Sequence, residues 1–215
     1  MNFSETPIQM ASSTSFAPAF NCPTRVHGRA EFVKILPTLL DGASWALIAS
    51  PFIRETDILV NLERSENPPT VIYDGVTPNP TISEIIDLAA KLPSVDILVA
   101  VGGGSVIDTA KGTAALAAIE NNAEFFKDHL AKEIPLPDSF TAKPLIAVPT
   151  TSGTGSEVTQ WATIWGDDGA KYSLSHRSLY PKEAILDPGL CSFMPREVTL
   201  YSALDALSHA MESIW

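Results

Sequence analysis

The sequence has few cysteines, few positive charges and no long apolar run, and each shortage excludes a class of protein. Cys22 and Cys191 are isolated thiols without the spacing of a metal site or a disulfide framework, which favours a reducing compartment. Lysine and arginine number 14 against 25 acidic residues, and the net charge of -11 disfavours nucleic acid and anionic membranes as partners. No apolar run approaches the roughly 20 residues that cross a bilayer. We therefore expect a cytoplasmic protein with neither a nucleic-acid nor a membrane partner.

The chain does contain a regular alternation of strand-like and helix-like stretches. Residues 1–23 lack the basic start and the apolar core of a secretory signal, so we expect a loose leader there. Over residues 24–194, short apolar runs alternate with helical periodicity, which predicts a parallel α/β sheet. The expected strands are 24–27, 45–49, 70–73, 97–101, 145–148 and 184–186, the main helices 31–40 and 82–92, and an added hairpin 161–165 with 172–174.

The pattern is centred on residues 95–112, where a short apolar run rich in β-branched residues is followed by three glycines and then by a helical repeat. Gly102, Gly103 and Gly104 let the backbone approach a ligand closely. The helix that begins near Ser105 would direct its free amides and its positive dipole end at that ligand. The stretch therefore predicts a phosphate or pyrophosphate site. The alternative is a turn that only packs the helix on the strand.

A second loop, residues 149–157, is dense in hydroxyl side chains and glycine and follows the strand expected at 145–148. In a parallel sheet this loop and the glycine turn would lie together at the carboxyl edge, where open α/β sheets bind ligands. The alternative is a polar surface turn. Two small-residue loops at one edge favour ligand contact.

The last helix begins after Pro195 and carries apolar residues around nearly its whole circumference, so we expect it to be buried. Asp205 and His209 interrupt the apolar surface, and their spacing of four places both on one face, as a helical metal pair requires. The alternative is an acid and an imidazole that satisfy each other. A catalytic divalent metal needs at least three protein ligands, and the other histidines show no helpful spacing. The sequence stops within this helix without a stop signal, so we expect a fragment.

Residues 102–111, 149–159 and 205–212 together resemble the iron-containing (group III) alcohol dehydrogenase family. The resemblance implies a parallel-sheet, Rossmann-like dinucleotide-binding domain over residues 24–194. Residues 195–215 would then form the first helix of a helical metal-binding domain, as in the architecture shared by dehydroquinate synthase and iron-dependent alcohol dehydrogenases. Such enzymes transfer hydride between NAD(P)H and a carbonyl compound held by Fe²⁺, or in some members Zn²⁺.

The resemblance also implies roles for individual residues. Asp205 and His209 match the first two metal ligands, while the other two ligands of the family are histidines on later helices without a counterpart here. No side chain beyond the metal pair is expected to be catalytic. The cofactor-binding residues that the resemblance implies are Ser50, Asn79, Gly102, Gly103, Gly104, Ser105, Asp108, Thr150, Thr151, Thr154, Ser156 and Lys171.

Cofactor choice depends on the residue that follows the strand at 45–49. Members that prefer NAD tend to carry an acid there, which accepts hydrogen bonds from the ribose diol and repels a 2′-phosphate. This sequence has Ser50 at that place and Arg54 nearby. We therefore expect NADPH to be tolerated and even preferred, with NADH as the alternative.

Within the family, residues 161–165, 171–176 and 204–215 are most similar to members that reduce phosphonoacetaldehyde to 2-hydroxyethylphosphonate. Lys171, His176 and Arg177 would supply the cations that a phosphonate dianion needs, although His176 and Arg177 fit a solvated strand end equally well. The rival functions are a dehydrogenase of a neutral short-chain alcohol or diol and an inactive nucleotide-binding fragment. The expected partner is a small aldehyde or alcohol, and a homodimer remains open.

Overall fold

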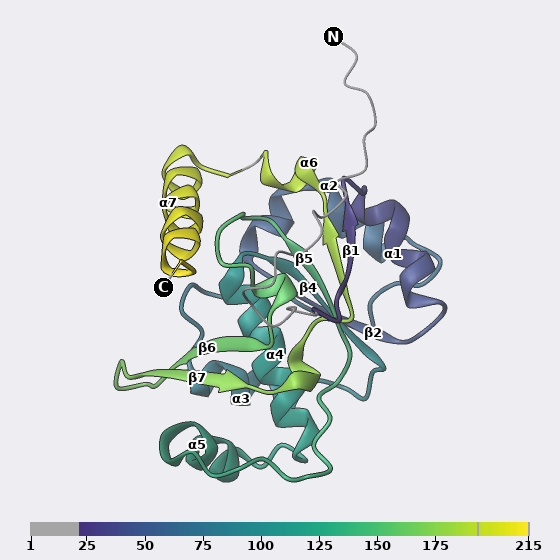
Figure 1. Cartoon of the computed structure of the whole chain (residues 1–215). Coiled ribbons are helices and arrows are strands. Elements are labelled where there is room, and N and C mark those ends of the chain that lie inside the picture. The colour runs from purple at the N-terminus through teal and green to yellow at the C-terminus, as the bar shows by residue number, and fades with distance from the viewer. Residues whose placement is uncertain (1–21, 193, 215) are drawn as a thin grey trace.

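A computed structural model describes residues 22–192 and 194–214, so the predicted leader at 1–23 lies almost wholly outside the described residues (Figure 1). Six parallel strands form one sheet in the order β1-β8-β5-β4-β2-β3. The strands are β1 (Arg25–Gly28), β2 (Trp45–Ala49), β3 (Val71–Tyr73), β4 (Ile97–Gly102), β5 (Leu145–Pro149) and β8 (Glu183–Leu186). The predicted parallel α/β sheet is therefore confirmed, with boundaries within two residues of those expected.

Both faces of the sheet are covered by helices. The helices are α1 (Phe32–Leu40), α2 (Asp57–Glu63), α3 (Ile82–Lys91), α4 (Gly104–Ala118), α5 (Ala123–Lys132) and α6 (Pro188–Cys191), with short 3₁₀ turns η1 (Pro51–Glu55), η2 (Ser156–Val158) and η3 (Arg177–Leu179). Alternate residues of each central strand point to opposite faces. On β2, Ala46 and Ile48 join a core with α3 and α4, whereas Trp45 and Leu47 join a second core with α1 and α2.

Local sequence signals account for several of these boundaries. Thr81 caps α3: its hydroxyl accepts the Glu84 amide, and the Glu84 carboxylate accepts the Thr81 amide, a reciprocal capping box. α1 ends at Asp41, which adopts the left-handed conformation typical of a helix C-terminus. Pro195 stands immediately before the first residue of the last helix, α7 (Arg196–Glu212).

The carboxyl ends of β4 and β5 bring the two predicted ligand loops together. Gly102 pairs with Pro149 at the end of the ladder, and the Thr150 amide donates to the Gly102 carbonyl at 3.0 Å. The predicted hairpin is also present as β6 (Trp161–Trp165) and β7 (Lys171–Ser175), an antiparallel pair that packs against α4. Among the described residues, no helix is both long and apolar enough to cross a membrane.

The expectation that the last helix is buried is wrong for this chain. None of the residues of α7 is buried, and its apolar side chains from Val198 to Met211 are 37% to 65% exposed. Figure 1 shows α7, in yellow, standing to one side of the sheet. Apolar periodicity reports which surface a helix can bury, whereas burial also needs a packed partner, and no described element covers this one.

Candidate functional site

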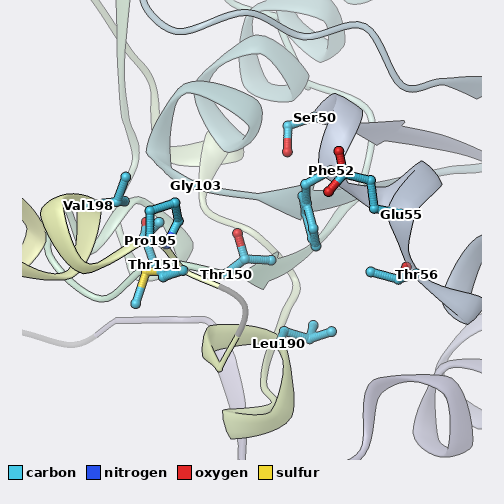
Figure 2. A pocket seen from close by; sticks show the side chains of 11 residues that line it. Ser50, Phe52, Glu55, Thr56, Gly103, Thr150, Thr151, Leu190, Pro195 and Val198 are labelled. Atoms are coloured by element: carbon cyan, nitrogen blue, oxygen red, sulfur yellow. The ribbon is translucent and has the colours of Figure 1, made fainter.

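Two cavities flank the glycine turn that joins β4 to α4. The small cavity, of about 310 Å³, is lined by Gly103, by Thr150 and Thr151 after β5, and by Ser50 after β2. Figure 2 shows Pro195 and Val198, at the start of α7, beside Gly103 and Thr151, with Phe52 and Glu55 across the cavity. The large cavity, of about 780 Å³, begins at the next residue of the turn, Gly104. Eleven of the twelve predicted cofactor-binding residues line one cavity or the other, and the twelfth, Gly102, ends β4 beneath them.

Polar residues from at least five parts of the chain line the large cavity. α4 contributes Gly104, Ser105 and Asp108, and the loop after β5 contributes Thr154 and Ser156. Asn79 lies beside the turn, because its amide donates to the Ser105 hydroxyl at 3.2 Å. Lys171, at the start of β7, and the α7 residues Asp205 and His209 complete this set. The fold thus brings segments separated by more than a hundred residues to one cavity.

The glycine turn has no room for side chains on its ligand side. A Cβ atom on Gly104 would lie 2.7 Å from the Thr154 Cγ2 atom, and one on Gly103 would lie 3.2 Å from the Thr151 hydroxyl. Threonine side chains therefore pack directly against the two glycines. Gly103 and Gly104 nevertheless line the two cavities, and α4 begins there with its first amides free of helical partners. A helix N-terminus without side-chain obstruction is suited to bind a phosphate group.

Asp108 carries an unsatisfied acceptor at the wall of the large cavity. Its Oδ2 atom accepts the Thr163 amide at 3.0 Å, but its buried Oδ1 atom has no hydrogen-bond partner among the described residues. Burial raises the pKa of this carboxyl, and the Thr163 hydrogen bond opposes that shift. The nearby Ser156 side chain also acts to lower the pKa of this carboxyl.

Asp205 and His209, the predicted metal ligands, lie together on α7. The Asp205 Oδ2 and His209 Nδ1 atoms lie 3.7 Å apart, one helical turn from each other, and both side chains are about half exposed toward the large cavity. A carboxylate and an imidazole suit Fe²⁺ or Zn²⁺. Within residues 22–192 and 194–214, however, no third histidine, cysteine or carboxylate joins them. The pair fits half of the ligand set that such a metal needs.

The predicted basic cluster does not form. Lys171 begins β7 and lines the large cavity, but His176 and Arg177 follow the other end of the strand. The His176 Nδ1 atom bonds the Ser178 hydroxyl at 2.8 Å, and its ring packs edge-on against Phe140. A five-residue strand spans about 16 Å, which places these two side chains beyond the reach of a ligand held at Lys171. His176 instead serves as the N-cap of η3.

The residues around Ser50 also differ from the expectation for a 2′-phosphate site. The Arg54 guanidinium makes two hydrogen bonds to the Asp74 carboxylate and lowers its pKa, so this cation is engaged away from the cavity. Glu55, by contrast, lines the small cavity, and Figure 2 shows its carboxylate turned toward Ser50. An acid therefore does stand beside Ser50, although it comes five residues later in the sequence than expected.

Sequence inspection overlooked several residues of the two cavities. Phe52, Leu190 and Val198 line the small cavity, and Trp161 and Trp165 line the large one. These residues lie on helices, short turns and strands, and which of their side chains face a cavity depends on tertiary packing, so no local signal marks them. The buried Lys111 of α4 was overlooked as well, although it lies three residues after Asp108 in an otherwise apolar helix. That spacing is a signal of the same kind as Asp205 and His209.

Comparison with known proteins identifies the family of the chain. The model of the iron-containing alcohol dehydrogenase family matches residues 23–188. The chain is 42% identical over 144 residues to 4-hydroxybutyrate dehydrogenase of Cupriavidus necator. This match covers 66% of the chain and 37% of the relative. It is 36% identical over 166 residues to phosphonoacetaldehyde reductase of Streptomyces viridochromogenes, and this match covers 75% of the chain and 40% of the relative. The chain belongs to the iron-containing alcohol dehydrogenase family.

Solved structures show the same fold. NADH-dependent butanol dehydrogenase A of Thermotoga maritima superimposes with a TM-score of 0.78 at 29% identity, over 91% of this chain and 50% of that one. The chain thus spans half of the length of this structure and less than half of the two curated relatives. The family assignment and the Rossmann-like α/β fold expected from the sequence are both confirmed.

Proposed function

We propose that the chain binds a nicotinamide dinucleotide across the glycine turn, as part of an oxidoreductase that transfers hydride between this cofactor and an aldehyde or alcohol. The observation that carries the proposal is that eleven of the twelve predicted cofactor residues and both predicted metal ligands line two cavities that meet at Gly103 and Gly104. The free amides of α4 would hold the pyrophosphate. Ser50, with Thr150 and Thr151, would contact one nucleoside in the small cavity, and the other would occupy the large cavity beside Asp108 and Lys171.

Asp205 and His209 would supply two ligands to Fe²⁺, or alternatively Zn²⁺, at the far side of the large cavity. When bound, such a metal polarises a carbonyl oxygen and makes the carbon susceptible to hydride. The residues proposed to bind the dinucleotide line the same cavity as Asp205 and His209, so they would hold the cofactor beside the metal. The surroundings of Ser50 support NADH as the better cofactor. Arg54 is bonded to Asp74, and the Glu55 carboxylate faces the site where a 2′-phosphate would have to fit. This proposal reverses the expectation drawn from Ser50 and Arg54 alone.

The proposed substrate is a short aldehyde with an anionic end, for which phosphonoacetaldehyde is the first candidate. Similarity to phosphonoacetaldehyde reductase supports it, and so does Lys171, which offers a cation to the large cavity. Similarity to butanol dehydrogenase favours the alternative, a neutral short-chain aldehyde or alcohol. His176 and Arg177 are not part of this proposal, since the structure places them away from the cavity.

The test has two stages, so that cofactor binding and turnover are measured separately. Trp161 and Trp165 line the large cavity, so bound NADH should quench their fluorescence by energy transfer. The oxidation of NADH is then followed by absorbance with Fe²⁺ and either phosphonoacetaldehyde or butanal. A preference for the phosphonate supports the reductase, and equal or reversed rates return the substrate to the neutral class. Binding without turnover supports the nucleotide-binding alternative, and absence of binding refutes the proposal.

A further inference from the structure

Lys111 is a fully buried lysine on α4, the helix whose N-terminus forms the glycine turn. Its Nζ atom donates to three backbone carbonyls, those of Ser156 at 2.8 Å, Thr159 at 2.7 Å and Trp161 at 2.7 Å. An ammonium has three donors and no acceptor, so these bonds use all of them. The ammonium therefore holds the backbone of the segment 156–161 at three positions.

The three residues held in this way are residues of the large cavity. Ser156, Thr159 and Trp161 all line it, whereas Lys111 itself is buried behind them. One turn earlier on α4, Asp108 holds a fourth lining residue through the Thr163 amide. Asp108 and Lys111 thus fix lining residues of the large cavity from the same helix whose N-terminus forms the glycine turn.

A purely stabilising role explains this arrangement poorly. Burial lowers the pKa of Lys111 to about 8, which means that the site disfavours the charged ammonium relative to water. A buried apolar side chain of similar size would avoid that cost. Ser156 and Thr159 precede β6, so their carbonyls have no strand partner and accept from the ammonium instead. The ammonium therefore fixes the backbone of the cavity lining rather than the sheet.

We propose that Lys111 is a positioning residue for the dinucleotide: it holds the segment from Ser156 to Trp161 in the conformation that shapes the large cavity. This inference rests on the proposed function, because it requires that the cavity bind the nucleotide. It assigns Lys111 no contact with the ligand. Loss of the ammonium would release three of the lining residues at once while the sheet beneath them stays intact.

The test compares K111M with K143M. Lys143 also ties down a backbone carbonyl, that of Val95, but at the amino end of the sheet, away from both cavities. NADH affinity is measured through the fluorescence of Trp161 and Trp165, at a temperature well below the melting temperature of each variant. We expect K111M to weaken NADH binding about ten- to a hundredfold, because a misplaced wall costs affinity far beyond the contact removed. K143M should lower the melting temperature and leave the affinity unchanged.

A second variant covers the case in which K111M does not fold. K111Q keeps amide donors but is shorter and uncharged, so it should reach fewer of the three carbonyls and give an affinity below that of the native protein. A folded Lys111 variant with native NADH affinity, or K143M with the same loss as K111M, overturns the positioning role. Failure of the native protein to bind NADH would instead refute the proposed function itself.

Discussion

Two helices, α4 and α7, each carry a pair of polar residues at or directly behind the wall of the large cavity, and the two pairs have opposite surroundings. On α4 every residue from Val106 to Leu116 is buried, and the polar side chains of Asp108 and Lys111 bond to the backbone of other segments. On α7 none of the residues is buried, and Asp205 and His209 have each other at 3.7 Å. The first pair is held by the fold, and the second pair is held only by its own helix.

This difference shows which half of the site the fold of this chain determines. The position of α4 follows from its contacts with β4, β6 and α3, so the glycine turn at its start is fixed whenever the sheet forms. The position of α7 depends on the loop after β5, where the Gly153 backbone approaches closely: a Cβ atom there would lie 2.8 Å from the Ser202 carbonyl oxygen. Nucleotide binding should therefore tolerate changes in α7, and metal binding should not.

The largest expected effect tests this separation directly. H209A removes one of the two metal ligands that the chain supplies, so metal-dependent turnover should be abolished while NADH affinity stays within about twofold of native. Turnover, iron content and tryptophan quenching are measured on the same preparation. S208A is the matched control, because Ser208 is the neighbouring exposed residue and bonds only Glu212. Full turnover in H209A would exclude the metal role of the pair.

The second prediction compares how much the apolar side chains of α4 and α7 contribute to the free energy of unfolding. Ile107 on α4 is 0% exposed and Leu207 on α7 is 55% exposed. Truncation to alanine should therefore lower the free energy of unfolding by about 2–5 kcal/mol at Ile107 and by less than about 0.5 kcal/mol at Leu207. Urea denaturation of both variants measures the difference. A similar loss at both sites would mean that Leu207 is covered in solution, for which a second copy of the chain is one candidate, and sedimentation would show it.

How far the sequence predicts this molecule depends on the kind of signal. Strand and helix positions follow from local periodicity and from caps such as Thr81, and they were predicted within a few residues. The two ligand loops were predicted because parallel strands must end at one edge. The predictions that α7 is buried and that His176 joins a basic cluster were wrong, because both depend on what packs nearby. No described element covers Leu207. The ring of Phe140 and the hydroxyl of Ser178 contact the His176 imidazole.

The third prediction concerns the pH dependence of stability that the buried Lys111 of α4 should produce. The pKa of Lys111 is about 8 in the folded protein, below the ordinary 10.5 of the unfolded chain. Between these values the unfolded state holds a proton that the folded state has released, so the free energy of unfolding should rise as the pH increases. The contribution of this group is about 3 kcal/mol from pH 7.5 to 10.5.

Other groups titrate in the same window, so the measurement is a difference between two proteins. Urea denaturation of the native protein and of K111M at pH 7.5 and pH 10 gives the rise for each, and only the native protein should show the Lys111 contribution. Equal rises in the native protein and K111M would mean that the ammonium keeps an ordinary pKa in the fold.

The smallest expected effect is on cofactor preference at the small cavity, which the starts of α4 and α7 both line. Gly103 precedes α4 and Val198 is in the first turn of α7, and both line the small cavity with Glu55. E55Q removes the carboxylate that would repel a 2′-phosphate, so the ratio of NADPH to NADH affinity should rise about three- to tenfold, mainly through tighter NADPH binding. E63Q, on the exposed side of α2, makes the same charge change away from the cavity and should leave the ratio unchanged. If the native protein prefers NADPH and E55Q does not alter that preference, Arg54 must leave Asp74 to bind the phosphate, and D74N should then strengthen NADPH binding further.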